Sequence, residues 1–203
     1  MLPTESCELW NLGPNLTLLS FDSLSDDAKN QLKEWRYRQE KVTRNSWHLD
    51  FILQAYLVAR RSLDAQTKCG CILVRDKTII GTGYNSFIRN IKDNILPNLR
   101  PEKYPFMIHS EHNAILNCAK NGISTDGARA YLTGPPCCNC LQYMYQAGII
   151  EIYYANYNKA EMTCNKEYDT QFEILAHLMQ NIKIVCLDLD KETLEKIEKI
   201  KSC

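Results

Sequence analysis

The sequence lacks an excess of either charge, a long apolar run, an internal repeat and a low-complexity tract. Its 203 residues hold 24 Lys and Arg and 24 Asp and Glu, so no surplus of positive charge indicates a surface for long nucleic acids. No stretch approaches the length of a transmembrane helix, and the opening residues, MLPTESCELWNLGPN, lack the basic and apolar segments of an export signal. We therefore expect a cytoplasmic protein that binds a small molecule and neither a long nucleic acid nor a membrane.

What the sequence does have is the composition of one globular domain, and ten cysteines. Hydrophobic residues make up 45% of the chain and charged residues 24%, which is enough for a substantial core. Without an export signal, reduced thiols are the better expectation than disulfides. Seven cysteines are scattered through apolar or terminal segments and are interpreted as small packed residues: Cys7, Cys69, Cys71, Cys118, Cys164, Cys186 and Cys203. Only the cluster at 137–140 has ligand-like spacing.

Hydrophobic periodicity divides the chain into two parts. Residues 1–45 are predicted to be an N-terminal extension with one polar helix at 23–44, for which Ser25 is the candidate N-cap. No function follows from the sequence of this extension. Residues 46–203 are predicted to form the folded domain.

Helical and strand periods alternate within this domain. Helices are predicted at 47–62, 109–122, 137–148, 169–181 and 191–201, and strands at 69–75, 78–85, 128–133, 150–157 and 182–189. This order favours an α/β fold, a three-layer helix/sheet/helix sandwich with a five-stranded mixed sheet. The irregular segment at 86–108 contains three prolines and is longer than a connector needs, so we expect it to be functional.

Three residues offer the ligands of a catalytic zinc site: His109, Cys137 and Cys140. One imidazole and two thiolates suit tetrahedral zinc and leave its fourth position open for water or substrate. Cys137 and Cys140, in GPPCCNC, are neighbours on one helical face, whereas Cys138 is rotated away by about 100° and is expected to be a packed residue. Pro136 suits a helix start, where the positive dipole end lowers the pKa of the thiols.

Glu111 is two residues from His109, and side chains two apart in mid-helix point in nearly opposite directions. They converge only at a helix start, which HSEHNAIL allows because Pro105 lies upstream and the apolar period begins at Ala114. Glu111 is then placed beside the metal, where it accepts a proton from zinc-bound water. The pattern H-x-E followed by P-C-x-x-C is typical of zinc-dependent nucleobase deaminases.

From Trp47 to about Tyr157 the chain resembles the deoxycytidylate (dCMP) deaminases of animals and phages. The similar stretches are ARRSLDAQTKCGCILV, IIGTGYN, LRPEKYPFMIHSEHNAIL, YLTGPPCCNC and QAGIIEIYYANY. The resemblance implies the cytidine deaminase fold, a homo-oligomer, and hydrolytic conversion of dCMP to dUMP by a zinc-bound hydroxide. It also implies that His109, Cys137 and Cys140 are the zinc ligands and that Glu111 is the proton shuttle.

The same resemblance implies nucleotide contacts. Asn85 matches the residue that holds the sugar, Lys120 stands where a phage enzyme has an arginine for the substrate phosphate, and Tyr157 lies near a tyrosine used on the nucleotide. Ser110 replaces the usual alanine of HAELNAI and is expected to contact the base through its backbone. His112 is a second departure from that motif.

Other interpretations fit parts of the pattern. The cysteines and His109 would also serve a structural or redox site, and His112 would close a structural zinc site as a fourth ligand. Taken alone, Asn85 reads equally as a turn residue and Lys120 as a solvated residue near a helix C-terminus. The same zinc chemistry serves polynucleotide deaminases, of tRNA adenosine or DNA cytosine, although the neutral net charge argues against one. A non-catalytic zinc-stabilised binding module would have no use for Glu111.

Overall fold

The computed structural model describes residues 25–27, 39–41, 46–92, 95–155, 175, 179 and 181–202. Their elements, in chain order, are β1 (Gln39–Lys41), α2 (Trp47–Ala59), β2 (Gly70–Arg75), β3 (Thr78–Tyr84), α3 (Ser110–Lys120), β4 (Arg129–Leu132), α4 (Cys138–Gln146), β5 (Glu151–Ala155), β6 (Lys183–Asp188) and α6 (Lys191–Ser202). Within these ranges no helix is both long and apolar enough to cross a bilayer.

The described strands form one mixed sheet in the order β1-β6-β5-β4-β2-β3. β2 pairs antiparallel with β3 and with β4, whereas β4, β5, β6 and β1 run parallel to one another. Because β2 runs against its two neighbours, its start lies beside the ends of β3 and β4. Gly70 pairs with Tyr84, and Cys71 pairs with Leu132. The loops that follow β3 and β4 therefore meet at one edge of the sheet.

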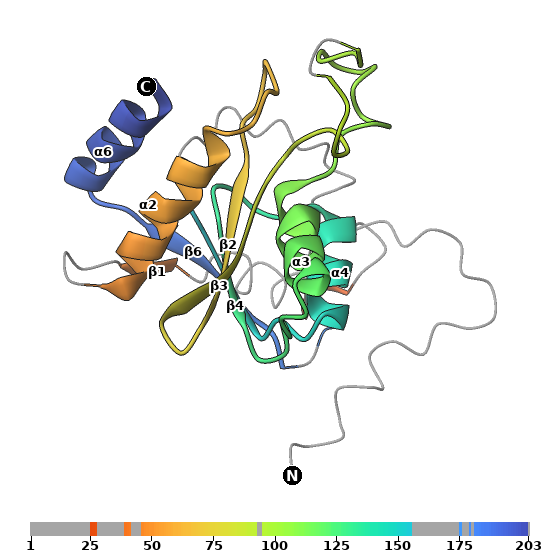
Figure 1. The fold of residues 1–203 in the computed structure, drawn as a ribbon. Helices are drawn as coiled ribbons and strands as arrows, with labels where there is room; N and C mark the ends of the chain where they lie inside the picture. Colours follow the sequence, from red (N-terminus) through yellow and green to blue (C-terminus); the bar gives the residue numbers. More distant parts are fainter. Residues whose placement is uncertain are drawn as a thin grey trace.

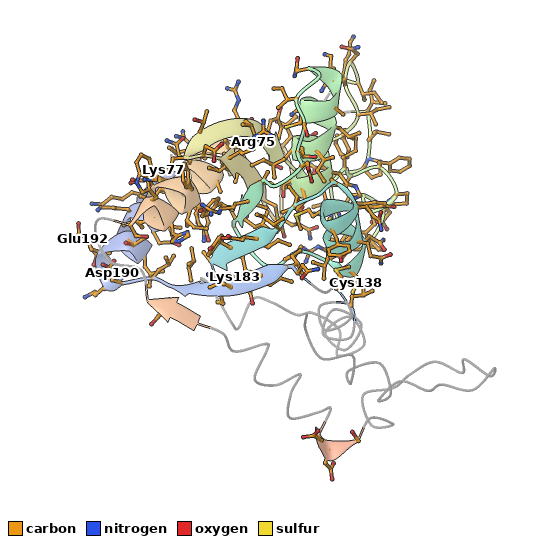
Figure 2. All side chains as sticks on the ribbon, turned by 90° about the horizontal axis from the view of Figure 1, so that it is seen from below. Arg75, Lys77, Cys138, Lys183, Asp190 and Glu192 are labelled. Carbon is orange, nitrogen blue, oxygen red and sulfur yellow. The ribbon has the colours of Figure 1, made fainter. Side chains whose placement is uncertain are left out.

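Helices cover both faces of the sheet (Figure 1), with α2 and α6 on one side and α3 and α4 on the other. Successive residues of β2 point to opposite faces of the sheet and are buried on both, as expected for a strand covered on both faces. Cys71 and Leu73 join the core beneath α3 and α4, whereas Ile72 and Val74 join the core beneath α2 and α6. Figure 2 shows the same division, with Cys138 labelled on α4 and Glu192 at the start of α6. The predicted three-layer α/β sandwich is confirmed.

Glycines let α2 and α3 lie directly against the sheet. A Cβ on Gly70 would overlap the carbonyl oxygen of Ala55 in α2, and a Cβ on Gly83 would overlap the carbonyl oxygen of Ser110 and the amide of Ala114 in α3. The close approach at Gly83 fixes the first turn of α3 against β3. This turn carries Glu111.

The five predicted strands are all present, and a sixth, β1, adds an edge that the sequence did not predict. Residues 39–41 were expected in the polar helix at 23–44, so that helix does not extend to residue 44. The three residues pair in parallel with Cys186–Asp188, and this pairing outweighs their local helical pattern. Asp26 and Asp27 are helical, directly after Ser25, and the predicted helix at 169–181 lies almost wholly outside the described residues.

Candidate active site

His109 lies at the N-terminal end of α3, where the chain turns from an extended loop into the helix. It is the N-cap residue, with φ −69° and ψ 156°, and Ser110 is the first helical residue. An extended N-cap residue is not bound to the helical spacing of side chains, so the imidazole of His109 and the carboxylate of Glu111 need not point apart. The upstream chain is held by a bridge between Ser86 and Ile108, whose backbone groups exchange hydrogen bonds of 2.8 and 3.0 Å.

Cys137 and Cys140 lie at the start of α4, which faces α3. Cys137 is the N-cap residue, and its Sγ accepts a hydrogen bond of 3.5 Å from the backbone N–H of Cys140. The Nδ1 atom of His109 lies 3.6 Å from Sγ of Cys137 and 3.3 Å from Sγ of Cys140. Two helix N-termini therefore bring the three side chains together, as the spacing of the motif predicts.

These three residues fit a zinc ion. Their ligand atoms all lie within 4.8 Å of one another, and they form the one such group of three found among the described residues. The hydrogen bond from Cys140, with that from His109, lowers the pKa of Cys137 to about 4, which favours a thiolate. The neighbouring Cys137 sulfur, burial and the charge of Glu111 raise the pKa of Cys140. A dication between the two sulfurs would remove this repulsion, and both thiolates would then be stable.

Glu111 is buried in the first turn of α3, 7% exposed, beside the cluster and not part of it. Its charge and the hydrogen bond with Cys137 raise the pKa of His109. The hydroxyl of Ser110 donates a hydrogen bond of 2.9 Å to Oε2 of Glu111. A carboxylate held next to a metal site without binding the metal has the position of a general base.

A family profile described as "Cytidine and deoxycytidylate deaminase zinc-binding region" matches residues 45–156, more than half of the chain. The chain belongs to this family. It is 32% identical over 143 residues to the human deoxycytidylate deaminase, an alignment that covers 67% of this chain and 75% of the human protein. It is also 40% identical over 118 residues to ComE operon protein 2 of Bacillus subtilis, of which it spans 61%, less than two thirds.

The fold has relatives among solved structures. The dCMP deaminase from the cyanophage S-TIM5, crystallised in complex with dCMP and dUMP, matches with a TM-score of 0.56 and 24% identity. The match covers 70% of this chain and 98% of the phage chain. At this identity the match shows the deaminase fold, while the family assignment rests on the profile and on the human relative.

Lys120, the predicted phosphate contact, does not lie in this cluster. Lys120 is the last residue of α3, so the helix axis separates it from His109 by about 16 Å. The structure therefore does not bring Lys120 to the cluster within one chain. Tyr157 lies outside the described residues. Ser110 lies in the first turn of α3, directly between His109 and Glu111.

Neither His112 nor Cys138 joins the metal ligands. The ring of His112 lies edge-on to that of Tyr143, with centroids 4.4 Å apart, and its centroid lies 6.3 Å from that of His109. His112 is absent from the group whose ligand atoms converge, which argues against a fourth protein ligand. Cys138 is also absent from that group and is buried, 7% exposed, as predicted for a packed residue.

Asn85 directly follows β3, and its side chain is buried in a network that the sequence did not predict. The carboxamide contacts Asp64, Thr67 and Cys69. Asp64 in turn pairs with Lys103, from the irregular segment before His109. One signal was present in the sequence, since Lys103 stands between two prolines in a segment too long for a connector.

Proposed function

We propose that this protein hydrolytically deaminates dCMP to dUMP, with release of ammonia. The observation that carries the proposal is the convergence of His109, Cys137 and Cys140 with Glu111 beside them, in a chain of the cytidine and deoxycytidylate deaminase family. The human relative is named a deoxycytidylate deaminase, and the cyanophage enzyme of the same fold was crystallised with dCMP and dUMP.

His109, Cys137 and Cys140 would hold the zinc ion. When bound, zinc supplies the Lewis acidity that makes water a nucleophile near neutral pH. Glu111 accepts a proton from the water that attacks C4 of cytosine and passes it to N3. It then takes the proton of the hydroxyl now on C4 and passes it to the leaving amine, which departs as ammonia. Its carboxylate is restored at the end of the cycle, so no redox cofactor takes part.

Burial of the site supports these roles. Glu111 is 7% exposed and Cys140 is 0% exposed, so bulk water is largely kept from the proton shuttle and from one of the proposed ligands, whereas His109 is exposed and Cys137 is half-buried. The hydroxyl of Ser110 holds the carboxylate of Glu111 at Oε2, which fixes its orientation for proton transfer. The backbone of Ser110, beside both groups, is the proposed contact to the base.

A comparison of substrates tests the proposal. Turnover is measured by ammonia release with dCMP, with deoxycytidine and with a cytosine-containing oligonucleotide, on zinc-loaded protein. We expect the highest kcat/KM for dCMP. A preference for the oligonucleotide would replace the proposal with a polynucleotide deaminase, and zinc binding without any ammonia release would replace it with a non-catalytic module.

We also propose that the enzyme is a homo-oligomer in which Lys120 meets the phosphate of a substrate bound to another copy. The exposed position of Lys120 at the far end of α3 supports a contact between chains rather than within one. Sedimentation analysis gives the oligomeric state. Replacement of Lys120 by Met should raise KM for dCMP far more than for deoxycytidine, and equal effects would exclude a phosphate contact.

Tyr157 is also proposed to contact the nucleotide, because it lies near a tyrosine that the resembling enzymes use for this contact. An intracellular location is likewise proposed, because a site with two thiolate ligands needs reduced cysteines. Cys69, Cys71, Cys118, Cys137 and Cys140 have free thiols.

A further inference from the structure

A buried ion pair lies next to the candidate active site. Nζ of Lys103 lies 2.6 Å from Oδ1 and 2.7 Å from Oδ2 of Asp64, and the two residues are 2% and 3% exposed. A buried charge is tolerated only when it is paired and hydrogen-bonded, so each residue requires the other. Neither one contributes to the metal ligands.

Asp64 accepts hydrogen bonds from several parts of the chain at once. Besides Lys103, its donors are the backbone N–H of Gln66 at 2.8 Å, the backbone N–H of Thr67 at 2.9 Å, and Nδ2 of Asn85 at 3.1 Å. Burial alone raises the pKa of Asp64, but the hydrogen bond from Lys103 and the two backbone donors outweigh burial and lower it. The carboxylate is therefore ionised, and it can only accept hydrogen bonds.

This carboxylate decides the orientation of the Asn85 carboxamide. Nδ2 of Asn85 must face Asp64, and its second hydrogen is donated to the carbonyl oxygen of Thr67 at 2.8 Å. Oδ1 then faces the opposite way and accepts the backbone N–H of Cys69 at 2.7 Å. Both donors of Asn85 are used, and the one group left over is the second lone pair of Oδ1.

The network lies beside the helix that carries Glu111. Nδ2 of Asn113, in α3, donates a hydrogen bond of 2.8 Å to the carbonyl oxygen of Tyr84, the residue before Asn85. Burial, together with the charges of Glu111 and Asp64, raises the pKa of the Cys69 thiol to about 12. Lys103 also belongs to the segment that leads into His109, and its carbonyl oxygen accepts hydrogen bonds from Phe106 and Met107.

We infer that Lys103 and Asp64 are positioning residues for the substrate, which hold Asn85 with Oδ1 as the acceptor for a hydroxyl of the sugar. This inference rests on the proposed function and on the sugar contact that the family resemblance implies for Asn85, and it adds the two residues that orient the carboxamide. A hydroxyl can donate to the free lone pair of Oδ1, whereas an ether oxygen or a missing hydroxyl cannot. In dCMP the 3′-hydroxyl is the one free sugar hydroxyl, so the pair selects nucleotides that carry it.

The experiment couples a change in the ligand to a change in the protein. The substrates are dCMP and 2′,3′-dideoxycytidine 5′-monophosphate, which lacks the 3′-hydroxyl. The proteins are the zinc-loaded wild type and the double variant Asp64→Asn with Lys103→Met. Both residues are changed together because removal of one partner would leave a buried unpaired charge.

We expect loss of the 3′-hydroxyl to lower kcat/KM by about fivefold to tenfold in the wild type, the worth of one hydrogen bond. In the double variant the same change of substrate should cost less than about twofold, since Asn85 is then free to turn. A purely structural pair would lower activity on both nucleotides alike and leave their ratio unchanged. An equal ratio in both proteins overturns the inference.

Lys196→Met is the matched control, because it removes a lysine from the exposed pair with Glu192 on α6. Its ratio of kcat/KM for dCMP to kcat/KM for the dideoxy nucleotide should equal that of the wild type. If the double variant fails to fold or to hold zinc, Asp64→Asn with Lys103→Gln, which also removes both charges and lets the two side chains share a hydrogen bond, takes its place, with the same two expected ratios. If the wild type turns over dCMP but the ratio of kcat/KM for the two nucleotides is the same in wild type and double variant, this inference alone is overturned. If the wild type does not turn over dCMP, the proposed function is overturned as well.

Discussion

Ser110 donates a hydrogen bond of 2.9 Å from its hydroxyl to Oε2 of Glu111, and both side chains are buried in the first turn of α3. The two residues are adjacent in the chain, so the bond is local and does not depend on the metal ligands. It restrains the carboxylate at one oxygen, Oε2. The usual motif of the resembling deaminases, HAELNAI, has alanine at this position, so the restraint is a property of this chain.

Ser110→Ala is expected to lower kcat by about fivefold with little change in KM, because a hydrogen bond to the reacting carboxylate is worth about 1 kcal/mol. Zinc content should stay the same, since the hydroxyl does not contact the metal ligands. Steady-state kinetics with dCMP measure both constants. Ser202→Ala, at the exposed end of α6, is the control. An unchanged kcat would mean that Glu111 needs no restraint from this hydroxyl.

Glu111→Gln is expected to lower kcat by at least about 10²-fold, because an amide cannot accept and return the proton. Zinc should remain bound at the wild-type ratio, since Glu111 does not belong to the group of converging ligand atoms. Ammonia release and metal analysis on the same sample separate the two effects. Loss of zinc together with activity would show that Glu111 is a metal ligand instead.

The three cysteines of GPPCCNC should respond differently to replacement by serine. Cys137→Ser and Cys140→Ser each remove one of the three proposed ligands and are expected to lose zinc and activity. Cys138→Ser changes a buried residue outside the ligand group and should keep most of both. Zinc content and ammonia release are measured for all three variants. A Cys138→Ser variant as damaged as Cys140→Ser would contradict the arrangement at the start of α4.

The metal site was predictable from the sequence because its geometry is local. Each half of the motif lies at a helix start, and the spacing of Cys137 and Cys140 fixes which sulfurs share a face. The constraint that His109 and Glu111 converge only at a helix start is confirmed by the N-cap position of His109. The layers of the fold were predictable for a similar reason, since helical and strand periods alternate along the chain, and β2 is buried along almost its whole length, as a strand covered on both faces must be.

What the sequence did not predict depends on contacts between distant segments. The partners Asp64 and Lys103 are 39 residues apart and lie in loops without any period. β1 is only three residues long, and what makes it a strand is the free edge of β6 rather than its own pattern. Lys120 was assigned by position in the chain, and an 11-residue helix is enough to carry it away from the cluster.

Gly83→Ala is expected to disturb the site without touching a ligand. The added Cβ would overlap backbone atoms of Ser110 and Ala114, which cannot move aside as a side chain does. The first turn of α3 must shift, at a cost of about 1–3 kcal/mol in the free energy of unfolding and with weaker zinc binding. Gly134→Ala, which meets no atom within 4 Å, is the control for stability. Denaturant unfolding and zinc titration measure the two effects, and wild-type values for both would contradict the close packing.

The Asp64–Lys103 pair gives the fold a defined pH dependence. The pKa of Asp64 is lowered from its ordinary value of 3.8, because the hydrogen bonds from Lys103 and the backbone outweigh the effect of burial. An acid with a depressed pKa in the folded state contributes stability above the unfolded value and loses it as the pH falls through the folded value. The contribution of the pair is therefore constant from neutral pH down to about 5 and is lost below 3.8.

The measurement is the free energy of unfolding against pH for the wild type and for the double variant Asp64→Asn with Lys103→Met. Subtraction of the two curves cancels the acid release of zinc, which both proteins share. The free energy of unfolding of the wild type minus that of the double variant is expected to be constant from pH 7 to about 5. Below about pH 4 this difference should fall, because protonation of Asp64 leaves the buried Lys103 without its counter-charge. A difference that stays flat down to pH 3 would show that the pKa of Asp64 is not lowered in the folded protein, and would contradict a stabilising pair with Lys103.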